Sequence, residues 1–140
     1  MTALIHRSSG DPRRTSTLGP YRIEALLDRA EARAGTVYRV AIAPGQLTAI
    51  SYHQIAEEYY FVLAGGGVAL LDGQEHRLRP GDFLRLPPGT RHGFQAGPEG
   101  LEMLDIHTPG CWPDHDTYFE GTAPVGFAPS PGQRPTDTSP

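Results

Sequence analysis

Two stretches of the sequence decide the fold: residues 45–65, GQLTAISYHQIAEEYYFVLAG, and residues 81–96, GDFLRLPPGTRHGFQA. Each begins with a glycine that follows a proline, and each contains short apolar or alternating runs typical of strands. Side chains two positions apart on a strand share a face, so Ser51 and His53 point to the same side. On the next strand Glu58 and Tyr60 do the same. A carboxylate on a buried face needs a partner, because burying an unpaired charge is costly.

Short strand-like runs separated by turn residues continue on both sides of these stretches. The predicted strands are Val37–Ala43, Leu47–His53, Tyr59–Leu63, Val68–Leu71, Glu75–Leu78, Phe83–Leu86, His92–Gln95 and Leu101–His107. Asp72-Gly73, between two of them, is typical of a two-residue hairpin turn. Many short strands at regular spacing predict an all-β fold, an antiparallel sandwich or barrel, and the jelly roll is among the few solutions of this size.

One helix is expected, near the N-terminus. Apolar residues recur at helical spacing from Ile23 to Ala30, and Gly35 stands where a helix would end. The pattern therefore predicts a short helix over about residues 22–34. The polar residues 1–18 are expected to form a flexible arm and the proline-rich residues 128–140 a flexible tail, which leaves residues 19–127 as a single domain.

The composition excludes several functional classes. The 140 residues include 12 Arg but no Lys, which excludes Schiff-base chemistry and a P-loop lysine. The net charge is −4 and the predicted domain is more acidic still, so we expect no nucleic-acid partner. The single cysteine, Cys111, cannot form an intramolecular disulfide or a cysteine-rich zinc site. Because the chain shows no long apolar run and no secretory signal, we expect no membrane partner and a cytoplasmic location.

The two stretches resemble the two motifs of the cupin superfamily. Residues 45–65 are similar to the first motif, G-x5-H-x-H-x4-E-x6-G, and residues 81–96 to the second, G-x5-P-x-G-x2-H-x3-N. Two positions depart from these motifs: Ser51 replaces the first histidine and Ala96 replaces the asparagine. The resemblance implies a small single-domain cupin with a jelly-roll β-barrel, and it implies a homodimer.

The same resemblance implies a metal ion inside the barrel, held by His53, Glu58 and His92. Ser51 would be a weak or water-mediated ligand, or only a lining residue. The residue types support this interpretation, because two imidazoles and one carboxylate match the ligand triad of non-haem iron sites. We expect a divalent ion, iron first, with manganese, zinc and nickel as alternatives. Three protein ligands leave positions open for water, oxygen or substrate.

Two further residues are candidate catalytic groups. His107, on the last predicted strand, is a candidate acid, base or substitute ligand, although a position at the strand end is the simpler interpretation. Tyr60 shares the face of Glu58 and is the second candidate. By contrast His76, in a hairpin arm, is expected to be exposed.

Other polar residues allow two interpretations each. Arg39, Arg85 and Arg91 either clamp a substrate carboxylate or pair with the surplus acids, and for each of them the pairing is favoured. Residues 114–116, Asp-His-Asp, either bind a metal or form a solvated loop, and the loop is favoured. Cys111 is expected to be a packed or exposed thiol rather than a nucleophile.

Two classes of function fit this sequence. The first is a metal-dependent enzyme that acts on a small organic substrate, either a dioxygenase or an isomerase or cyclase that uses the metal as a Lewis acid. The second is a non-catalytic cupin that binds or senses a small molecule in the barrel. Ser51 is the residue that distinguishes these two classes. It replaces a histidine ligand of the motif, and the loss of a histidine weakens a metal site.

Overall fold

The computed structural model describes residues 2–127, and nearly all of their regular structure is β. The strands are β1 (Thr15–Leu18), β2 (Tyr21–Ala25), β3 (Thr36–Ile42), β4 (Ser51–Tyr52), β5 (Glu57–Leu71), β6 (Gln74–Leu78), β7 (Phe83–Leu86), β8 (His92–Thr108) and β9 (Tyr118–Phe119). A 3-10 turn, η1 (Pro12–Arg14), precedes β1. The predicted all-β fold is confirmed.

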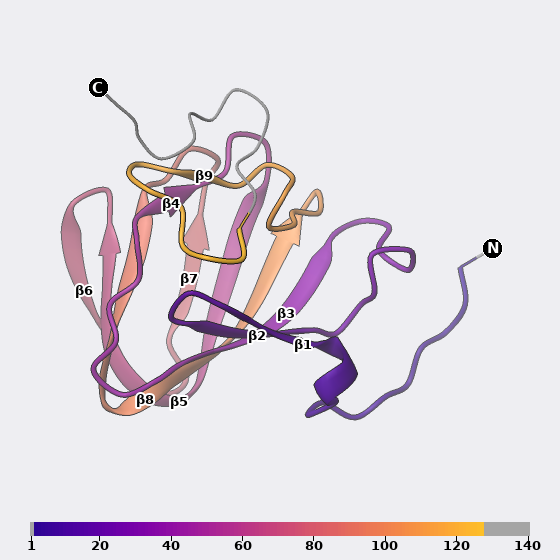
Figure 1. Ribbon diagram of the computed structural model, residues 1–140, viewed down its shortest axis with the longest axis horizontal. Coiled ribbons are helices and arrows are strands. Elements are labelled where there is room, and N and C mark those ends of the chain that lie inside the picture. Colours follow the sequence, from indigo (N-terminus) through magenta and orange to yellow (C-terminus); the bar gives the residue numbers. More distant parts are fainter. Residues whose placement is uncertain (1, 128–140) are drawn as a thin grey trace.

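The two longest strands, β5 and β8, run antiparallel along almost their whole length, from Glu57 opposite Thr108 to Leu71 opposite His92. Register shifts within residues 62–67 interrupt this pairing, and the sheet curls back on itself there (Figure 1). One half of the curled sheet continues from β8 through β3, β2 and β1 and carries β7 on β5. The other half carries β6 on β5 and β4 on β8, and β9 pairs with the far edge of β4.

A glycine is required where β5 bends. Gly65 has a φ of 74°, in the left-handed region that other residues rarely adopt. A Cβ atom at this position would lie 2.1 Å from the carbonyl oxygen of Gly100 on β8. The close approach of the two backbones therefore leaves no room for any side chain.

The inside of the curled sheet is apolar at one end and polar at the other. Alternate residues of β3 are buried from Thr36 to Ile42. The apolar core includes Val40, Ile42, Val62, Phe94, Leu101 and Met103. Further along the same strands the inward side chains become polar, with buried Glu58, His92, Asp105 and His107. These polar side chains mark the candidate site.

The predicted helix over residues 22–34 is wrong. Tyr21–Ala25 form β2, which pairs with β3 so that Ile23 lies opposite Val40. The rest of the segment, up to residue 35, consists of turns and bends. The helical spacing of the apolar residues is a local signal, and the free edge of β3 overrides it by offering a strand partner.

The chain before β2 is held against it. Residues 12–18, within the predicted arm, form η1 and β1. The amides of Gly10 and Asp11 donate to the carboxylate of Glu24, which is buried in β2. The predicted tail, residues 128–140, lies outside the described residues.

Candidate metal and substrate site

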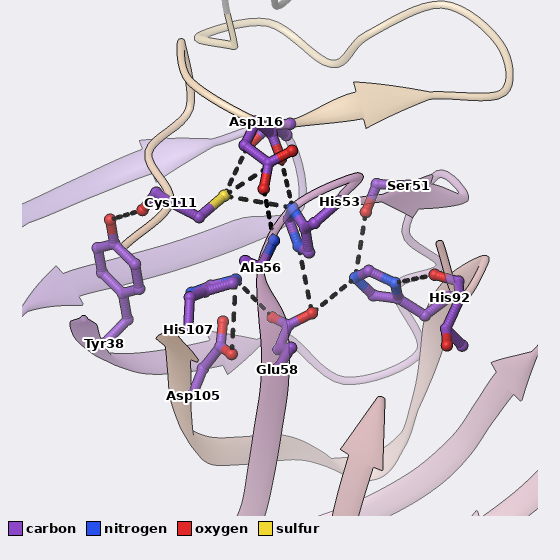
Figure 2. Close-up of polar contacts among 12 residues, drawn as sticks. Tyr38, Ser51, His53, Ala56, Glu58, His92, Asp105, His107, Cys111 and Asp116 are labelled. Carbon is purple, nitrogen blue, oxygen red and sulfur yellow. Dashed lines mark hydrogen bonds and ion pairs between the residues drawn. The ribbon is translucent and has the colours of Figure 1, made fainter. Parts of the chain in front are cut away.

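Four buried side chains meet at the polar end of the curled sheet (Figure 2). His53 directly follows β4, Glu58 is the second residue of β5, and His92 is the first residue of β8. His107 lies near the other end of β8. It meets His92 at one site because both ends of β8 pair with β5 and the sheet curls between them.

Glu58 is the centre of this group. Its Oε1 atom lies 3.2 Å from Nε2 of His53 and 3.2 Å from Nε2 of His92. Its Oε2 atom lies 2.7 Å from Nε2 of His107. Glu58 is only 1% exposed, so these three rings replace water around its carboxylate.

The distances around Oε1 suit ligands of one metal ion. Two ligand atoms at about 2.1 Å from the same ion lie about 3.0 Å apart in octahedral and about 3.4 Å apart in tetrahedral coordination. Both Nε2–Oε1 distances, at 3.2 Å, lie between these values. Oε1 is also buried without a hydrogen-bond partner, although two ring nitrogens face it. The donor set of His53, Glu58 and His92 therefore fits a divalent metal ion.

Backbone carbonyls orient the two rings. Nδ1 of His53 lies 2.7 Å from the carbonyl oxygen of Asp116, and Nδ1 of His92 lies 2.9 Å from that of Thr90. A carbonyl only accepts, so Nδ1 carries the proton and donates in both rings. The Nε2 atom of a neutral ring then presents its lone pair to the site, as a metal-binding histidine does.

Asp116 shapes the loop that carries His53. Its carboxylate accepts hydrogen bonds from the backbone amides of Gln54 and Ala56, at 2.8 Å each, and from that of Ile55 at 3.2 Å. The solvated loop predicted for residues 114–116 is thus wrong for Asp116, which is 4% exposed. Asp114 and its neighbour at 115 are exposed, as expected. Spacing alone gave no signal for this role.

The charges of the site shift several pKa values. Burial raises the pKa of the Glu58 carboxyl, but its electrostatic interactions with the three histidines outweigh burial and hold it well below its usual value. Burial lowers the pKa of His53, but the charge of Glu58 and the Cys111 thiol raise it well above its usual value. For His92 burial dominates and lowers the pKa.

The two candidate catalytic residues both line the site. Nε2 of His107 faces Glu58, and its Nδ1 lies 3.4 Å from the hydroxyl of Thr36. The Thr36 hydroxyl accepts a hydrogen bond from the backbone amide of Cys111, and it can donate its own proton to Nδ1 of His107. His107 then carries its proton on Nε2 and donates it to Glu58. Tyr60 is buried, and its pKa lies well above the usual value, first because of burial and then because of the Asp105 charge.

Asp105 is a residue that the sequence analysis missed. It lies on β8 with its Oδ1 atom 3.9 Å from Nε2 of His107. Oδ1 is buried without a hydrogen-bond partner. Burial, and then the Glu58 charge, raise the pKa of Asp105 well above its usual value. The available signal was its place on the same face as His107, two positions earlier on a strand.

Ser51 lies beside His92. The two residues are opposite each other in the β4–β8 pair, and the Ser51 hydroxyl oxygen lies 3.4 Å from Nε2 of His92. Ser51 is buried. Its hydroxyl therefore borders the candidate metal position.

The three arginines lie away from the site. Arg39 pairs with Glu102, and Arg85 pairs with Glu57. Arg91 lies with its guanidinium 3.6 Å from the centre of the Tyr52 ring. Its Nε also pairs with Oε2 of Glu120 at 3.4 Å. The favoured interpretation, pairing with acids, thus describes all three arginines, and none of them lines the cavity.

Cys111 is packed, as expected. It is 2% exposed, and its sulfur lies 3.2 Å from Nδ1 of His53. His76 on β6 is exposed, also as expected. Neither residue is needed to complete the candidate donor set.

A cavity of about 70 Å³ opens beside these side chains. Its polar lining residues are Ser51, His53, Glu58, Tyr60, His92, Asp105, His107, Cys111 and Thr117. Its other lining residues are Tyr21, Ile23, Tyr38, Val40, Trp112, Pro113, Phe119 and Phe127. The volume has room for a few water-sized groups, at roughly 15 Å³ each, beside the candidate metal position.

Comparison with known families identifies the fold. Residues 38–107, half of the chain, match the family described as the Cupin domain. The chain belongs to the cupin family. The match extends from β3 almost to the end of β8, so it includes His53, Glu58, His92 and His107 in this cupin.

Three similar proteins show the range of this comparison. The dimethylsulfoniopropionate lyase DddW of Ruegeria pomeroyi is 34% identical over 89 residues, which cover 62% of this cupin and 58% of the lyase. Quercetin 2,3-dioxygenase of Bacillus subtilis is 36% identical over 61 residues, which cover 44% of this cupin and 18% of the dioxygenase. Streptomyces Pac13, solved with uridine and described as a nucleoside dehydratase, has a TM-score of 0.62 at 21% identity, covering 81% of this cupin and 84% of Pac13.

This cupin thus spans little more than half of the lyase and less than a fifth of the dioxygenase. The likeness to Pac13 supports the fold alone. Within residues 2–127, no helix has the length and apolar character needed to cross a membrane.

Proposed function

We propose that this cupin is a metal-dependent enzyme acting on a small organic molecule, with His53, Glu58 and His92 as the metal ligands. The observation that carries the proposal is the buried Oε1 atom of Glu58. It has no hydrogen-bond partner and lies 3.2 Å from two Nε2 atoms whose rings are oriented by backbone carbonyls. A divalent ion satisfies all three atoms at once.

The remaining residues have separate roles in this proposal. A bound ion would supply Lewis-acid polarisation of a substrate oxygen. His107 donates to Oε2 of Glu58 and so keeps Oε1 turned toward the two other rings. Tyr60 holds a proton on its buried hydroxyl in the same cavity, where it serves as a candidate acid.

The favoured reaction class is a non-redox elimination or isomerisation. The longer match is to a lyase, and the cavity combines candidate metal ligands with proton-carrying side chains. The match to a dioxygenase supports oxygen-dependent chemistry as a second candidate. Turnover of a substrate under strict anaerobiosis is expected for the first candidate, and substrate-dependent oxygen uptake would establish the second.

Metal binding is tested by elemental analysis of the purified full-length chain and by calorimetric titration with Zn²⁺, Fe²⁺ and Mn²⁺. We expect about one ion per chain in the natural protein. His92→Ala and Glu58→Gln are expected to lose it, because each removes one of three ligands. His76→Ala is the matched control, since this histidine is exposed on β6 and should leave the metal content unchanged.

A natural protein that is isolated without metal and gains none on titration would overturn the proposal. The alternative, a non-catalytic cupin that binds or senses a small molecule, would then be preferred. Ser51 is the residue that supports this alternative, because a serine hydroxyl is a weaker ligand than an imidazole. Wild-type metal content in Glu58→Gln and His92→Ala would instead show that the ligands are assigned wrongly.

A further inference from the structure

The walls of the cavity carry no arginine among the described residues, and the chain contains no lysine. Arg29 contacts one of the lining residues. Its guanidinium carbon lies 4.6 Å from the centre of the Trp112 ring. Its guanidinium is paired with Asp114 at 2.8 Å, and its side chain is 56% exposed. The charge of Arg29 is therefore already paired, and its side chain is exposed to solvent rather than buried in the cavity. Beyond the candidate metal position, nothing in the wall is built to hold a carboxylate or phosphate.

Away from the polar cluster around Glu58, the walls are aromatic or aliphatic. Tyr38 and Val40 line the cavity from β3, and Phe119 lines it from β9. The hydroxyl of Tyr38 is already used, because it donates to the carbonyl oxygen of Cys111 at 2.6 Å. Such walls bind the apolar part of a ligand and leave its polar groups to a few specific partners.

A second carboxyl oxygen in the cavity, besides Oε1 of Glu58, has no hydrogen-bond partner. Asp105 is 6% exposed and lines the cavity, and its Oδ1 atom makes no hydrogen bond with the described residues. Leaving a buried polar atom unsatisfied is unfavourable, and such atoms are rare outside functional sites. A ligand group that reached Oδ1 would remove this cost.

We propose that Asp105 is a substrate-positioning residue, and that the cavity takes a small, uncharged molecule whose hydroxyl group hydrogen-bonds to its carboxyl. A hydroxyl both donates and accepts, so it pairs with Oδ1 whether or not the carboxyl is protonated. The apolar walls bind the carbon skeleton. They carry no arginine or lysine to pair with an anion, and the charge of His53 is already paired with Glu58. The proposal rests on the proposed function, since it names the substrate class for the same site.

Trp112 provides a direct test, because it is the only tryptophan of the chain and lines the cavity. Its fluorescence is followed while the full-length protein, as purified and after treatment with EDTA, is titrated with butan-1-ol, butyrate or butylammonium. These probes share one carbon chain and differ in the charge of the polar group. The variants are Asp105→Leu, which removes the polar group, and Asp105→Asn, which keeps it.

We expect butan-1-ol to bind in the millimolar range and more tightly than either charged probe in the EDTA-treated protein. Asp105→Leu should weaken its binding about tenfold in both preparations, and Asp105→Asn should restore it to within about twofold. Asp105→Leu should fold with unchanged or higher stability to urea, because an apolar group then replaces an unpartnered polar one. This separates positioning from a structural role.

Tighter binding of butyrate or butylammonium to the EDTA-treated protein would overturn the proposal, as would equal butan-1-ol binding by Asp105→Leu and the natural protein. These outcomes do not depend on a bound metal. Failure of the proposed metal site would therefore be seen in the elemental analysis, whereas failure of the proposed role of Asp105 would be seen in the fluorescence titration.

Discussion

At the scale of single residues, one carboxylate organises the candidate site. Glu58 contacts three imidazoles through two oxygens, one of which has no hydrogen-bond partner. The pattern of the sequence already required a partner for this buried charge. The same surroundings shift the pKa values of two neighbouring histidines in opposite directions. The charge of Glu58 raises the pKa of His53 and favours its charged form, whereas burial lowers the pKa of His92 and favours its neutral form.

These opposite directions predict how metal affinity depends on pH. A metal ion binds the neutral ring, so His53 must release a proton that its raised pKa retains at neutral pH. His92 has a lowered pKa, so its Nε2 atom carries no proton to release at neutral pH. We expect Zn²⁺ affinity to rise about tenfold per pH unit from pH 6.5 upward, until the pH passes the raised pKa of His53.

The measurement is calorimetric titration in buffers with different ionisation enthalpies, which reports the number of protons released. About one proton per ion is expected at neutral pH. Release of no proton, with an affinity that stays flat between pH 6.5 and 8, would contradict the charge state given for His53.

At the scale of elements, the loop between β4 and β5 depends on a residue far along the chain. Asp116 gathers the amides of Gln54, Ile55 and Ala56 around its carboxylate, and its own carbonyl orients His53. The element that carries a candidate ligand is thus shaped by the segment after β8.

We expect Asp116→Ala to lower the free energy of unfolding by about 3 kcal/mol, because it leaves backbone donors without partners. It should also lower metal affinity at least tenfold by loosening His53. Asp114→Ala is the control. Asp114 is exposed and pairs with exposed Arg29, so its loss should cost less than about 1 kcal/mol.

Urea unfolding of both variants measures this difference. If Asp116→Ala were as stable as Asp114→Ala, the hydrogen bonds of Asp116 would not be what holds the loop.

At the scale of the whole molecule, two bent strands place the site. Both ends of β8 contribute side chains to one cavity only because β5 and β8 curl together around residues 62–67. The outer side of this sheet is partly apolar. Phe61 and Phe83 lie opposite each other on β5 and β7 and are 43% and 60% exposed.

The bend predicts a strong effect of Gly65→Ala. The new Cβ would meet the carbonyl oxygen of Gly100 at 2.1 Å, and φ is positive, so we expect a loss of about 3 kcal/mol or more in the free energy of unfolding. Gly73→Ala is the matched control. Its φ is also positive, at 81°, but no atom lies within 4 Å of the new Cβ, so about 1–2 kcal/mol is expected. Equal losses in thermal or urea unfolding would refute the role of the close approach.

The exposed aromatic pair supports the expected homodimer, which stays a prediction. We expect sedimentation velocity to show a dimer for the natural chain and a shift toward monomer for Phe83→Ser, because the change removes apolar area from the outer face. Leu47→Ser, at a residue 59% exposed elsewhere, should leave the association state unchanged. A monomeric natural chain would end this expectation.

Much of this protein follows from its sequence alone. The turn glycines and prolines and the short strand runs determined the all-β class, and the two motifs indicated the cupin family and the candidate ligands His53, Glu58 and His92. These are local signals, since each depends on residues within about twenty positions of one another. Local periodicity misled at residues 22–34, where the edge of β3 pairs with Tyr21–Ala25 as β2. It also predicted a strand over Leu47–His53, of which only Ser51–Tyr52 form β4.

Only the tertiary structure decided what surrounds the ligands. It buried Asp116 under the His53 loop, left Oδ1 of Asp105 without a hydrogen bond in the cavity and brought His107 to Glu58. It also kept the candidate arginines on the surface. The physical reason is that burial and hydrogen bonding depend on pairing between distant strands, above all on the bend that β5 and β8 share, and no spacing along the chain records where such strands meet.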